Sequence, residues 1–426
     1  MRSILFCVPY LLPMKNDCKV NQNSYYTFKY NNGLGRHGWL RLTPAYSVKL
    51  VEEILAGKPT DKSILDPFAG TSTTALCAAY KGFEASTVEL NPFSVWLGKV
   101  KTEIYDKALL ERMRAVGLEI TEGLRNNKYE PTDFPNLHNI ERWWGEEALV
   151  FLAKLKRGIS EFCGRKKATD LLQIAFCRTL ILISNASFNH QSMSFKKWPS
   201  NSLFGNHLVN YADVFNRSLS YVIETAFKNP SNKSEILQGD ALELHNIFHE
   251  KKFDLVITSP PYANRISYIR ELRPYMYWLD YLENGKDAGE LDWKTIGGTW
   301  GSATSKLNNW ENQEKKVIPS KIGVLLGDIA KGKNKNGMIL SKYVEKYLMD
   351  MWNHFKSLIQ VLNSGAEVHY IVGNSSFYGH LVPIEEAYQD MMQKLGFRNI
   401  EVKIIRKRNS NRNLYEFDVC ATFNPR

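Results

Sequence analysis

Short apolar runs alternate with helical patterns near the start of the chain. Residues 63–66 and 85–90 have the length and composition of buried strands, and the alanine-rich segment 72–81 between them has those of a helix. Apolar residues at helical spacing predict a further helix over 47–55. A strand, a tight turn, a helix and another strand in this order form the opening of a parallel α/β sheet.

The same rhythm returns after residue 232. It predicts three more buried strands, two more helices and a terminal antiparallel strand pair: strands over 235–237, 253–257 and 365–372, helices over 341–362 and 383–395, and the pair over 399–405 and 416–422. The predicted fold class is therefore α/β, with a largely parallel sheet that ends in an antiparallel pair.

Two stretches interrupt this rhythm. Residues 102–232 show four amphipathic patterns and are predicted to form a mostly helical insert. Residues 283–337 hold nine of the 27 glycines and no long apolar period, which predicts an extended, loop-rich insert. The chain then divides into 1–101, the helical insert 102–232, and 233–426, which resumes the sheet and includes the loop-rich insert.

Charge and composition narrow the class of protein. The chain has 426 residues and a net charge of +11. This charge favours a polyanionic partner such as nucleic acid; the alternative is a basic surface that binds no such partner. No apolar run reaches the roughly 18 residues of a membrane span, so no membrane partner is expected. Six scattered cysteines without CxxC or zinc spacing indicate reduced thiols, a cytoplasmic location and no metal site.

The strongest local chemistry lies at 258–262, directly after the predicted strand 253–257. Pro260 and Pro261 lack backbone N–H groups and cannot continue a central strand, so they form a rigid corner at its carboxyl end. Open α/β sheets bind ligands there. The Ser259 hydroxyl, the Pro260 carbonyl and the Tyr262 ring suit a planar base with an exocyclic amine, which would stack on the ring and donate to the two oxygens. The alternative is a plain turn with a buried tyrosine.

Two further strand ends carry candidate ligand-binding residues. Small residues that let the backbone approach a ligand follow the first strand: Asp66, Pro67, Phe68, Ala69, Gly70 and Thr71. Glu89 ends the next strand, where an acid commonly binds ribose hydroxyls. Asp240 follows the strand 235–237 and could accept a hydrogen bond from an adenine amino group. Each signal is weak alone, and the loop is not the GxGxxG of dehydrogenases.

Together these segments resemble the DNA amino-methyltransferases that use S-adenosylmethionine. The resemblance implies a Rossmann-like class I methyltransferase sheet in which 66–71 form the cofactor loop, Glu89 binds the ribose, Asp240 contacts the adenine, and 259–262 form the catalytic tetrapeptide. Thr43 and Pro44 resemble the family's extra motif, which closes over the methionine end of the cofactor. The resemblance covers roughly 36–100, 233–282 and 341–424.

The form of the tetrapeptide bears on the substrate. The tetrapeptide begins with serine, Ser259, and in this it resembles that of the enzymes that methylate N4 of cytosine. The adenine-N6 enzymes usually carry Asp or Asn at this position. The resemblance thus implies a site-specific methyltransferase that acts on a flipped-out cytosine in double-stranded DNA, paired with a restriction endonuclease. An adenine-N6 enzyme, an RNA base methyltransferase and an inactive DNA-binding subunit remain alternatives. The chain departs from the pattern at Ser72, where a second glycine is usual, and in having the cofactor loop before the tetrapeptide.

Basic residues suggest where DNA would lie. The densest basic run is 403–412, and within it Arg406, Lys407 and Arg408 are predicted to contact phosphates. Lys196 and Lys197 stand among aromatic and amide side chains, a mixture that could read bases. The alternatives are a solvated hairpin tip and a polar turn between helices.

Overall fold

The computed structural model describes residues 21–42, 45–162, 164, 166–187, 194–195, 210–265, 267–298, 302–312, 314, 317–332, 336–408 and 413–425. The strands within these residues are β1 (Ile64–Asp66), β2 (Ala85–Glu89), β3 (Ala186–Ser187), β4 (Ser194–Phe195), β5 (Glu235–Gln238), β6 (Phe253–Thr258), β7 (Leu362–Gly373), β8 (Ser375–Phe377), β9 (His380–Val382), β10 (Phe397–Lys407) and β11 (Tyr415–Phe423).

The helices run between and around these strands. They are α1 (Phe28–Asn31), α2 (Val48–Leu55), α3 (Thr73–Tyr80), α4 (Pro92–Thr102), α5 (Lys107–Arg125), α6 (Ile140–Trp143), α7 (Glu146–Glu161), α8 (Lys166–Leu182), α9 (Tyr211–Ala226), α10 (Leu244–Phe248), α11 (Tyr268–Trp278), α12 (Gly285–Lys294), α13 (Ser302–Asn309), α14 (Ser320–Lys331), α15 (Gly337–Leu358) and α16 (Ile384–Lys394).

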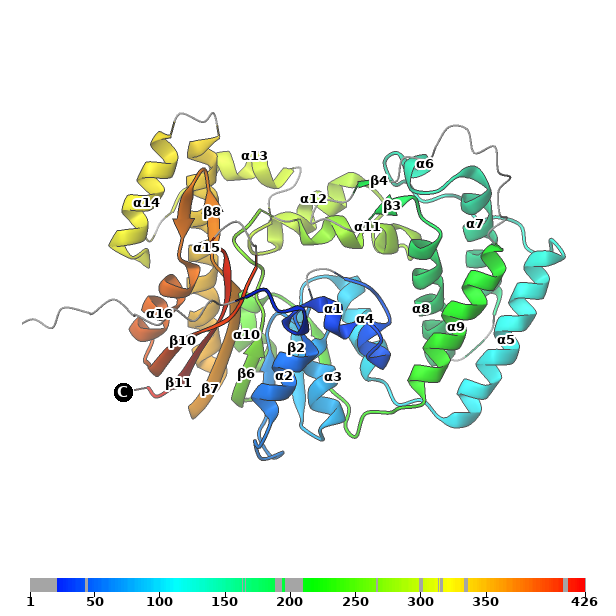
Figure 1. Ribbon diagram of the computed structural model, residues 1–426, viewed down its shortest axis with the longest axis horizontal. Helices are drawn as coiled ribbons and strands as arrows, with labels where there is room; N and C mark the ends of the chain where they lie inside the picture. The colour runs from blue at the N-terminus through cyan, green and yellow to red at the C-terminus, as the bar shows by residue number, and fades with distance from the viewer. Residues whose placement is uncertain are drawn as a thin grey trace, which may run out of the picture.

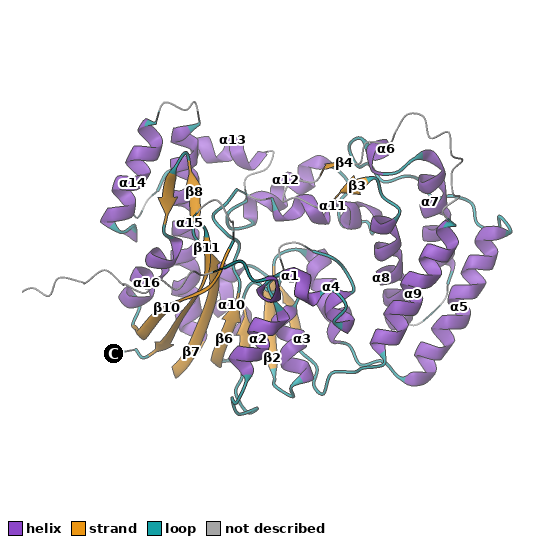
Figure 2. Ribbon diagram, in the orientation of Figure 1, coloured by secondary structure: helices purple, strands orange, loops and turns teal. Residues whose placement is uncertain are grey.

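The central sheet has seven strands in the order β10-β11-β7-β6-β1-β2-β5 (Figure 2). The five strands from β7 to β5 are parallel, and β11 and β10 add an antiparallel pair at one edge. Numbered by their order in the chain, the parallel strands read 3-2-1-4-5 from β5, which is the Rossmann-like order with its reversal between β1 and β6. The predicted α/β class with a terminal antiparallel pair is confirmed.

Alternate residues of the central strands enter two different cores. Ile64 and Ile257 pack with helices α2 and α3 on one face, whereas Leu65 and Val256 pack with α10, α15 and α16 on the other. Burial on both faces explains why these strands read as continuous apolar runs in the sequence. The sheet is thereby fixed from both sides, which holds the loops at its carboxyl edge in place.

The helices predicted within 102–232 are present and form a bundle beside the sheet (Figure 1). Helices α5, α7, α8 and α9 share one apolar core with α11, which follows the tetrapeptide 259–262 in the chain. Trp144 and Trp278 meet edge to face in this core, with ring centroids 5.9 Å apart. Helix α11 thus joins the bundle to the segment that leaves the carboxyl end of β6.

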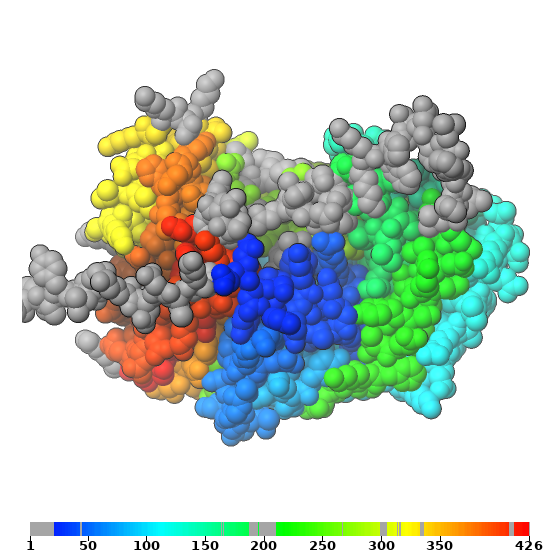
Figure 3. Space-filling model, viewed as in Figure 1, coloured from blue at the N-terminus to red at the C-terminus, as the bar shows by residue number. Residues whose placement is uncertain are grey.

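A buried arginine ties together the two connections between bundle and sheet. Arg36 donates to the carbonyl oxygens of Lys101 (3.0 Å) and Glu103 (2.5 Å) where the chain leaves the sheet. It also donates to the carbonyl of Ala226 (2.6 Å) and to the Asn229 side chain (2.8 Å) where the chain returns. In the space-filling view the N-terminal segments lie between the bundle and the C-terminal strands (Figure 3).

The prediction of a loop-rich insert over 283–337 is wrong. The described part of this region contains helices α12, α13 and α14. Ile322, Leu326 and Ile329 of α14 recur at helical spacing and are buried in the core that includes α15. Short helices rich in Lys and Gly gain their stability from such packing and not from propensity, so composition misled the prediction. Among the described residues, no helix combines the length and apolar character that crossing a membrane requires.

Candidate active site

The carboxyl ends of β1 and β6 meet where the strand order reverses. There the Thr258 hydroxyl donates to Asp66 Oδ1 (2.6 Å), and the Asp66 carboxylate also accepts the Phe68 N–H (3.1 Å). Burial raises the pKa of Asp66 to about 6, although these hydrogen bonds act against the shift. Asp66 does not line the pocket described below. Its carboxylate instead ties the predicted cofactor loop to β6, the strand that precedes the predicted catalytic tetrapeptide.

The predicted cofactor loop is held by contacts on both sides. Gly70 has φ +49°, a conformation that glycine adopts without strain, and its N–H donates to Glu89 Oε2 (2.7 Å). Lys101 of α4 donates to the Thr71 carbonyl oxygen (2.9 Å) from a buried position, and burial lowers the pKa of Lys101 to about 7. The loop is therefore fixed before any ligand binds.

Ser72, where the chain departs from the family pattern, does not obstruct the loop. Its backbone is left-handed, with φ 58° and ψ 40°, the conformation for which glycine would be usual. Its side chain is fully buried and points at Gly98 of α4, because a Cβ atom built on Gly98 would overlap Ser72 Oγ. The hydroxyl thus lies behind the loop, away from the pocket that the loop lines.

Glu89 and Asp240 follow neighbouring strands, β2 and β5, and both line the pocket. Glu89 Oε1 accepts the Asn91 N–H (2.8 Å), and Asp240 Oδ1 accepts the Leu242 N–H (3.0 Å). Burial raises the pKa of Glu89 to about 7 and also raises that of Asp240. A carboxylate oxygen that accepts one N–H keeps free lone pairs, so both acids can accept hydroxyl or amine hydrogens of a bound nucleoside.

The tetrapeptide 259–262 forms a fixed corner after β6. Ser259 donates its hydroxyl hydrogen to the Ile371 carbonyl oxygen of β7 (3.1 Å), and the Pro261 carbonyl accepts from the Tyr347 hydroxyl (2.9 Å). Ser259 and Pro261 line the pocket, whereas Pro260, which is buried, and Tyr262, which is partly buried, do not. With its hydrogen donated to β7, the Ser259 oxygen keeps lone pairs that can accept hydrogen bonds from the pocket.

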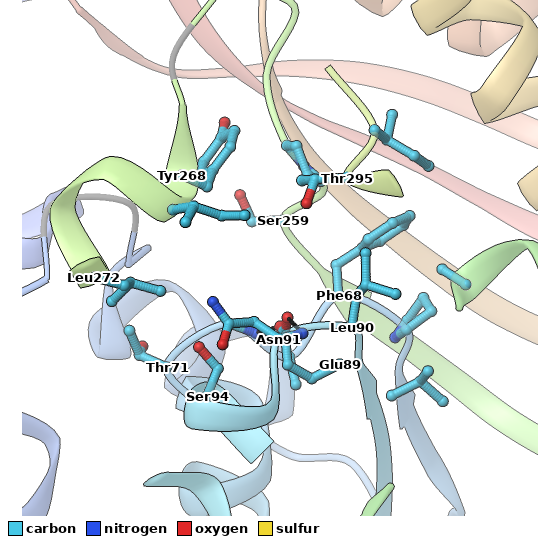
Figure 4. A pocket seen from close by; sticks show the side chains of 18 of the residues that line it. Phe68, Thr71, Glu89, Leu90, Asn91, Ser94, Ser259, Tyr268, Leu272 and Thr295 are labelled. Atoms are coloured by element: carbon cyan, nitrogen blue, oxygen red, sulfur yellow. Dashed lines mark hydrogen bonds between the residues drawn. The ribbon is translucent and has the colours of Figure 1, made fainter. Parts of the chain in front are cut away.

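One pocket of about 970 Å³ brings these segments together. Figure 4 shows Ser259, Tyr268 and Thr295 on one side of it and Glu89 and Asn91 on the opposite side. The predicted residues that line it are Pro67, Phe68, Ala69, Gly70, Thr71, Glu89, Asp240, Ser259 and Pro261. The reversal point of a Rossmann-like sheet, where this pocket lies, is where such folds bind nucleotides.

Curated relatives name an activity that fits this site. No family model matches the chain. It is 26% identical over 278 residues to the Type II methyltransferase M.MvaI of Kocuria varians, a match that covers 60% of this chain and 60% of that protein. It is 22% identical over 431 residues to the Type II methyltransferase M.BsoBI of Geobacillus stearothermophilus, with 90% and 83% covered.

The chain is similar to Type II methyltransferases. A third relative, M.AvaI of a Nostoc species, is 20% identical over 408 residues, which cover 88% of this chain and 81% of that protein. Among solved structures, an rRNA methyltransferase from Streptomyces viridochromogenes aligns over 88% of this chain and 86% of its own, with 11% identity. Its TM-score of 0.27 is too low to support an argument about fold or substrate.

The remaining predicted residues fall into two groups. Thr43, Pro44, Lys196 and Lys197 lie outside the described residues, so their roles stay predictions. Arg406 forms two hydrogen bonds to Glu416, and Arg408 donates to the Asn374 carbonyl oxygen, so both guanidinium groups have partners within the protein. Lys407 is half-buried beside them. Their contact with phosphates also stays a prediction.

The pocket also contains residues that the sequence did not point to. Tyr268 of α11 comes from the helix after the tetrapeptide, and Lys294, Thr295 and Ile296 follow α12 in the region expected to be loops. No motif marks these residues, and their positions depend on how α11 and α12 pack. Leu90 and Asn91 directly follow Glu89, and this adjacency is the one signal that could have found them.

Proposed function

We propose that the protein is a DNA methyltransferase that transfers a methyl group from S-adenosylmethionine to the N4 amine of a flipped-out cytosine. The observation that carries the proposal is the Ser259 hydroxyl, which faces a nucleotide-sized pocket with its hydrogen already donated to β7. The similarity to Type II methyltransferases supports DNA as the substrate and a restriction–modification system as the setting.

The residues of the pocket fit S-adenosylmethionine. The loop around Gly70 leaves room for close backbone approach, Glu89 can accept from ribose hydroxyls, and Asp240 can accept from the adenine amine. Phe68 and Leu90 supply apolar surface between the two acids. When bound, the cofactor supplies an electrophilic methyl group on a sulfonium.

Ser259 and Pro260 would prepare the amine for displacement. The lone pair of an aromatic amine is delocalised into its ring, which makes the nitrogen a poor nucleophile. Hydrogen bonds from the amine to the Ser259 oxygen and the Pro260 carbonyl favour tetrahedral geometry and direct the lone pair at the methyl carbon. The nitrogen–carbon bond forms as the sulfur–carbon bond breaks, and the excess proton leaves to water. Holding the reactants in near-attack geometry contributes several kcal/mol.

No strong base is needed for this reaction, because the proton becomes acidic only as the methyl group arrives. This agrees with a pocket whose lining, among the described residues, includes no histidine. The base must leave the duplex, at a cost of roughly a few kcal/mol. The +11 net charge supports binding of the duplex through its phosphates.

The test is the chemical identity of the product. We would express the chain in a host that lacks DNA methylation, digest the genomic DNA to nucleosides and quantify N4-methylcytosine and N6-methyladenine by mass spectrometry. Single-molecule sequencing would map the modified motif, and Ser259→Ala is the matched negative control. N4-methylcytosine at one short motif is expected. Detection of N6-methyladenine would support the same mechanism but show that adenine is the target base. If neither methylated base is found, the proposal of a DNA methyltransferase is contradicted.

A further inference from the structure

The ring of Tyr262 is held in one position by its neighbours. Its hydroxyl donates to Glu416 Oε1 (2.7 Å), and its backbone N–H donates to the Tyr268 hydroxyl (2.6 Å). Arg406 in turn holds Glu416 through two hydrogen bonds, of 2.7 and 3.1 Å. The aromatic face that the sequence predicts to stack on the target base is therefore presented by a rigid ring.

The guanidinium of Arg408 already lies over this ring. Its Cζ atom is 5.1 Å from the ring centroid of Tyr262, within the range of a cation–π contact. Arg408 Nη1 donates to the Asn374 carbonyl oxygen (2.8 Å), and the Arg408 backbone N–H donates to the Leu414 carbonyl (2.7 Å). The side chain is thus seated on an aromatic face and a carbonyl acceptor at the same time.

Gly373 leaves the space that this guanidinium fills. A Cβ atom built there would overlap Arg408 Nη1 and lie 2.9 Å from Arg408 Cζ and 3.1 Å from Tyr262 Cδ2. The backbone of Gly373 does not have the positive φ that favours glycine. The absence of a side chain at the end of β7 is therefore explained by the room that Arg408 occupies.

A guanidinium resembles the reactive edge of the proposed substrate. It is planar, and its N–C–N unit carries N–H donors. An aminopyrimidine has a planar N–C–N edge with an exocyclic NH₂, and it would likewise use an aromatic face and carbonyl acceptors. We propose that Arg408 holds the place of the target base over Tyr262 in the free protein, and that the base must displace it to reach Ser259. This inference rests on the proposed function and adds a gate to the same site.

The gate makes base binding and methylation separately testable. We would saturate the protein with S-adenosylhomocysteine and measure the dissociation constant of cytidine by saturation-transfer NMR. Arg408→Ala removes the guanidinium, and Gly373→Ala evicts it while keeping the charge. The matched control is Lys403→Ala, which removes one cation from β10, the strand that ends just before Arg408; Lys403 pairs with Glu401 (2.9 Å). Thermal denaturation would establish that each variant is folded.

Both Arg408→Ala and Gly373→Ala are expected to bind cytidine several-fold more tightly than the wild type, and Lys403→Ala as the wild type does. Adding Tyr262→Ala to Arg408→Ala should abolish the gain, because the vacated ring face is lost. Unchanged or weaker cytidine binding by Arg408→Ala would overturn the gate, as would no detectable binding by any variant. Methylation of DNA by the wild type would sustain the proposed function even in those cases.

Discussion

At the scale of single residues, Ser259 donates its hydroxyl hydrogen to the Ile371 carbonyl oxygen of β7. Ser259→Ala should lower the single-turnover rate of methyl transfer by about 10²-fold, the size of loss seen when one preorganised hydrogen-bonding group leaves a catalytic site. Because the cofactor loop lies on another strand, cofactor affinity measured by calorimetry should stay within about twofold. A Ser259→Ala protein that transfers methyl groups at the wild-type rate would rule out this serine as the acceptor.

The pairing of Ser72 with Gly98 gives a second residue-scale prediction. Gly98→Ala should destabilise the fold by about 1–3 kcal/mol, because the new Cβ overlaps Ser72 Oγ. Ser72→Gly removes that oxygen and relieves the left-handed backbone, so the double variant should regain most of the loss. The Ile236 side chain, 3.1 Å from the same Cβ, keeps the rescue incomplete. Denaturant titrations of the four proteins measure the coupling; additive effects would contradict the contact.

Ser72 and Gly98 illustrate which features of the site the sequence does not predict. The loop Asp66–Thr71 could be predicted only together with Glu89, Asp240 and the tetrapeptide 259–262, because small residues at a strand end are a weak signal alone. The direction of the Ser72 side chain could not be predicted, because it depends on α4 having a glycine at the facing position. The sequence placed Tyr262 in the corner after β6, but the guanidinium above its ring belongs to Arg408, 146 residues later in the chain.

At the scale of elements, strands with continuous apolar runs were predicted well, and helices α12–α14 were not. A buried parallel strand is apolar by itself, so its pattern survives in the sequence. Helix α14 has only Ile322, Leu326 and Ile329 facing the core, within a segment rich in Lys and Gly. Helix α14 is stabilised by packing against α15, and its own sequence does not show this contact. Thr295 was missed as a pocket residue for the same reason.

A buried ionic network joins β7 to β11. His369 donates to Asp418 (2.9 Å) and Glu367 (2.8 Å), and Lys58 pairs with Glu367 (2.6 Å). His369, Asp418 and Cys420 also lie within 4.8 Å of one another, a donor set that could hold a metal ion. With His369 protonated, the charges of the two carboxylates are balanced by two cations, which favours the ion-pair interpretation over a metal.

This network predicts a pH-dependent stability. Burial alone would lower the pKa of His369, but its hydrogen bonds to Asp418 and Glu367 outweigh burial and raise it. A pKa above the unfolded value of about 6.5 means that the stabilisation is complete below that pH and is lost as pH rises through the folded pKa. His369→Gln should therefore cost about 1–3 kcal/mol at pH 6 and clearly less at pH 9.

The matched control for this prediction is His354, a buried histidine of α15. Burial lowers the pKa of His354 to about 4, so it is neutral in the folded protein above pH 6. The cost of His354→Gln should be constant between pH 7 and 9. Unfolding titrations of His369→Gln from pH 6 to 9 and of His354→Gln from pH 7 to 9 decide the question. A cost of His369→Gln that does not change with pH would rule out the protonated network.

At the scale of the whole molecule, the pocket is assembled from segments that are distant in the chain. Gly70, Glu89, Asp240 and Ser259 reach one cavity because parallel strands place all their carboxyl ends at one edge, and Thr295 joins them from the end of α12. This rule allowed the first four to be grouped from the sequence alone. The residues that pack the helical bundle against α11 could not be identified in this way. Their contacts depend on how side chains from distant parts of the chain fit together.

Arg36 is where the bundle and the sheet are joined, and its replacement tests whether they unfold together. Arg36→Met keeps the volume but leaves three buried carbonyl oxygens without their donor, which should cost about 3–5 kcal/mol. The loss falls at both connections of the bundle, so calorimetry should show one unfolding transition for the wild type and two for Arg36→Met. Arg36→Lys can donate to only some of these carbonyl oxygens, so its stability should lie between those of the wild type and Arg36→Met. A single transition at the wild-type midpoint in Arg36→Met would show that the apolar contacts of α11 alone couple the two parts.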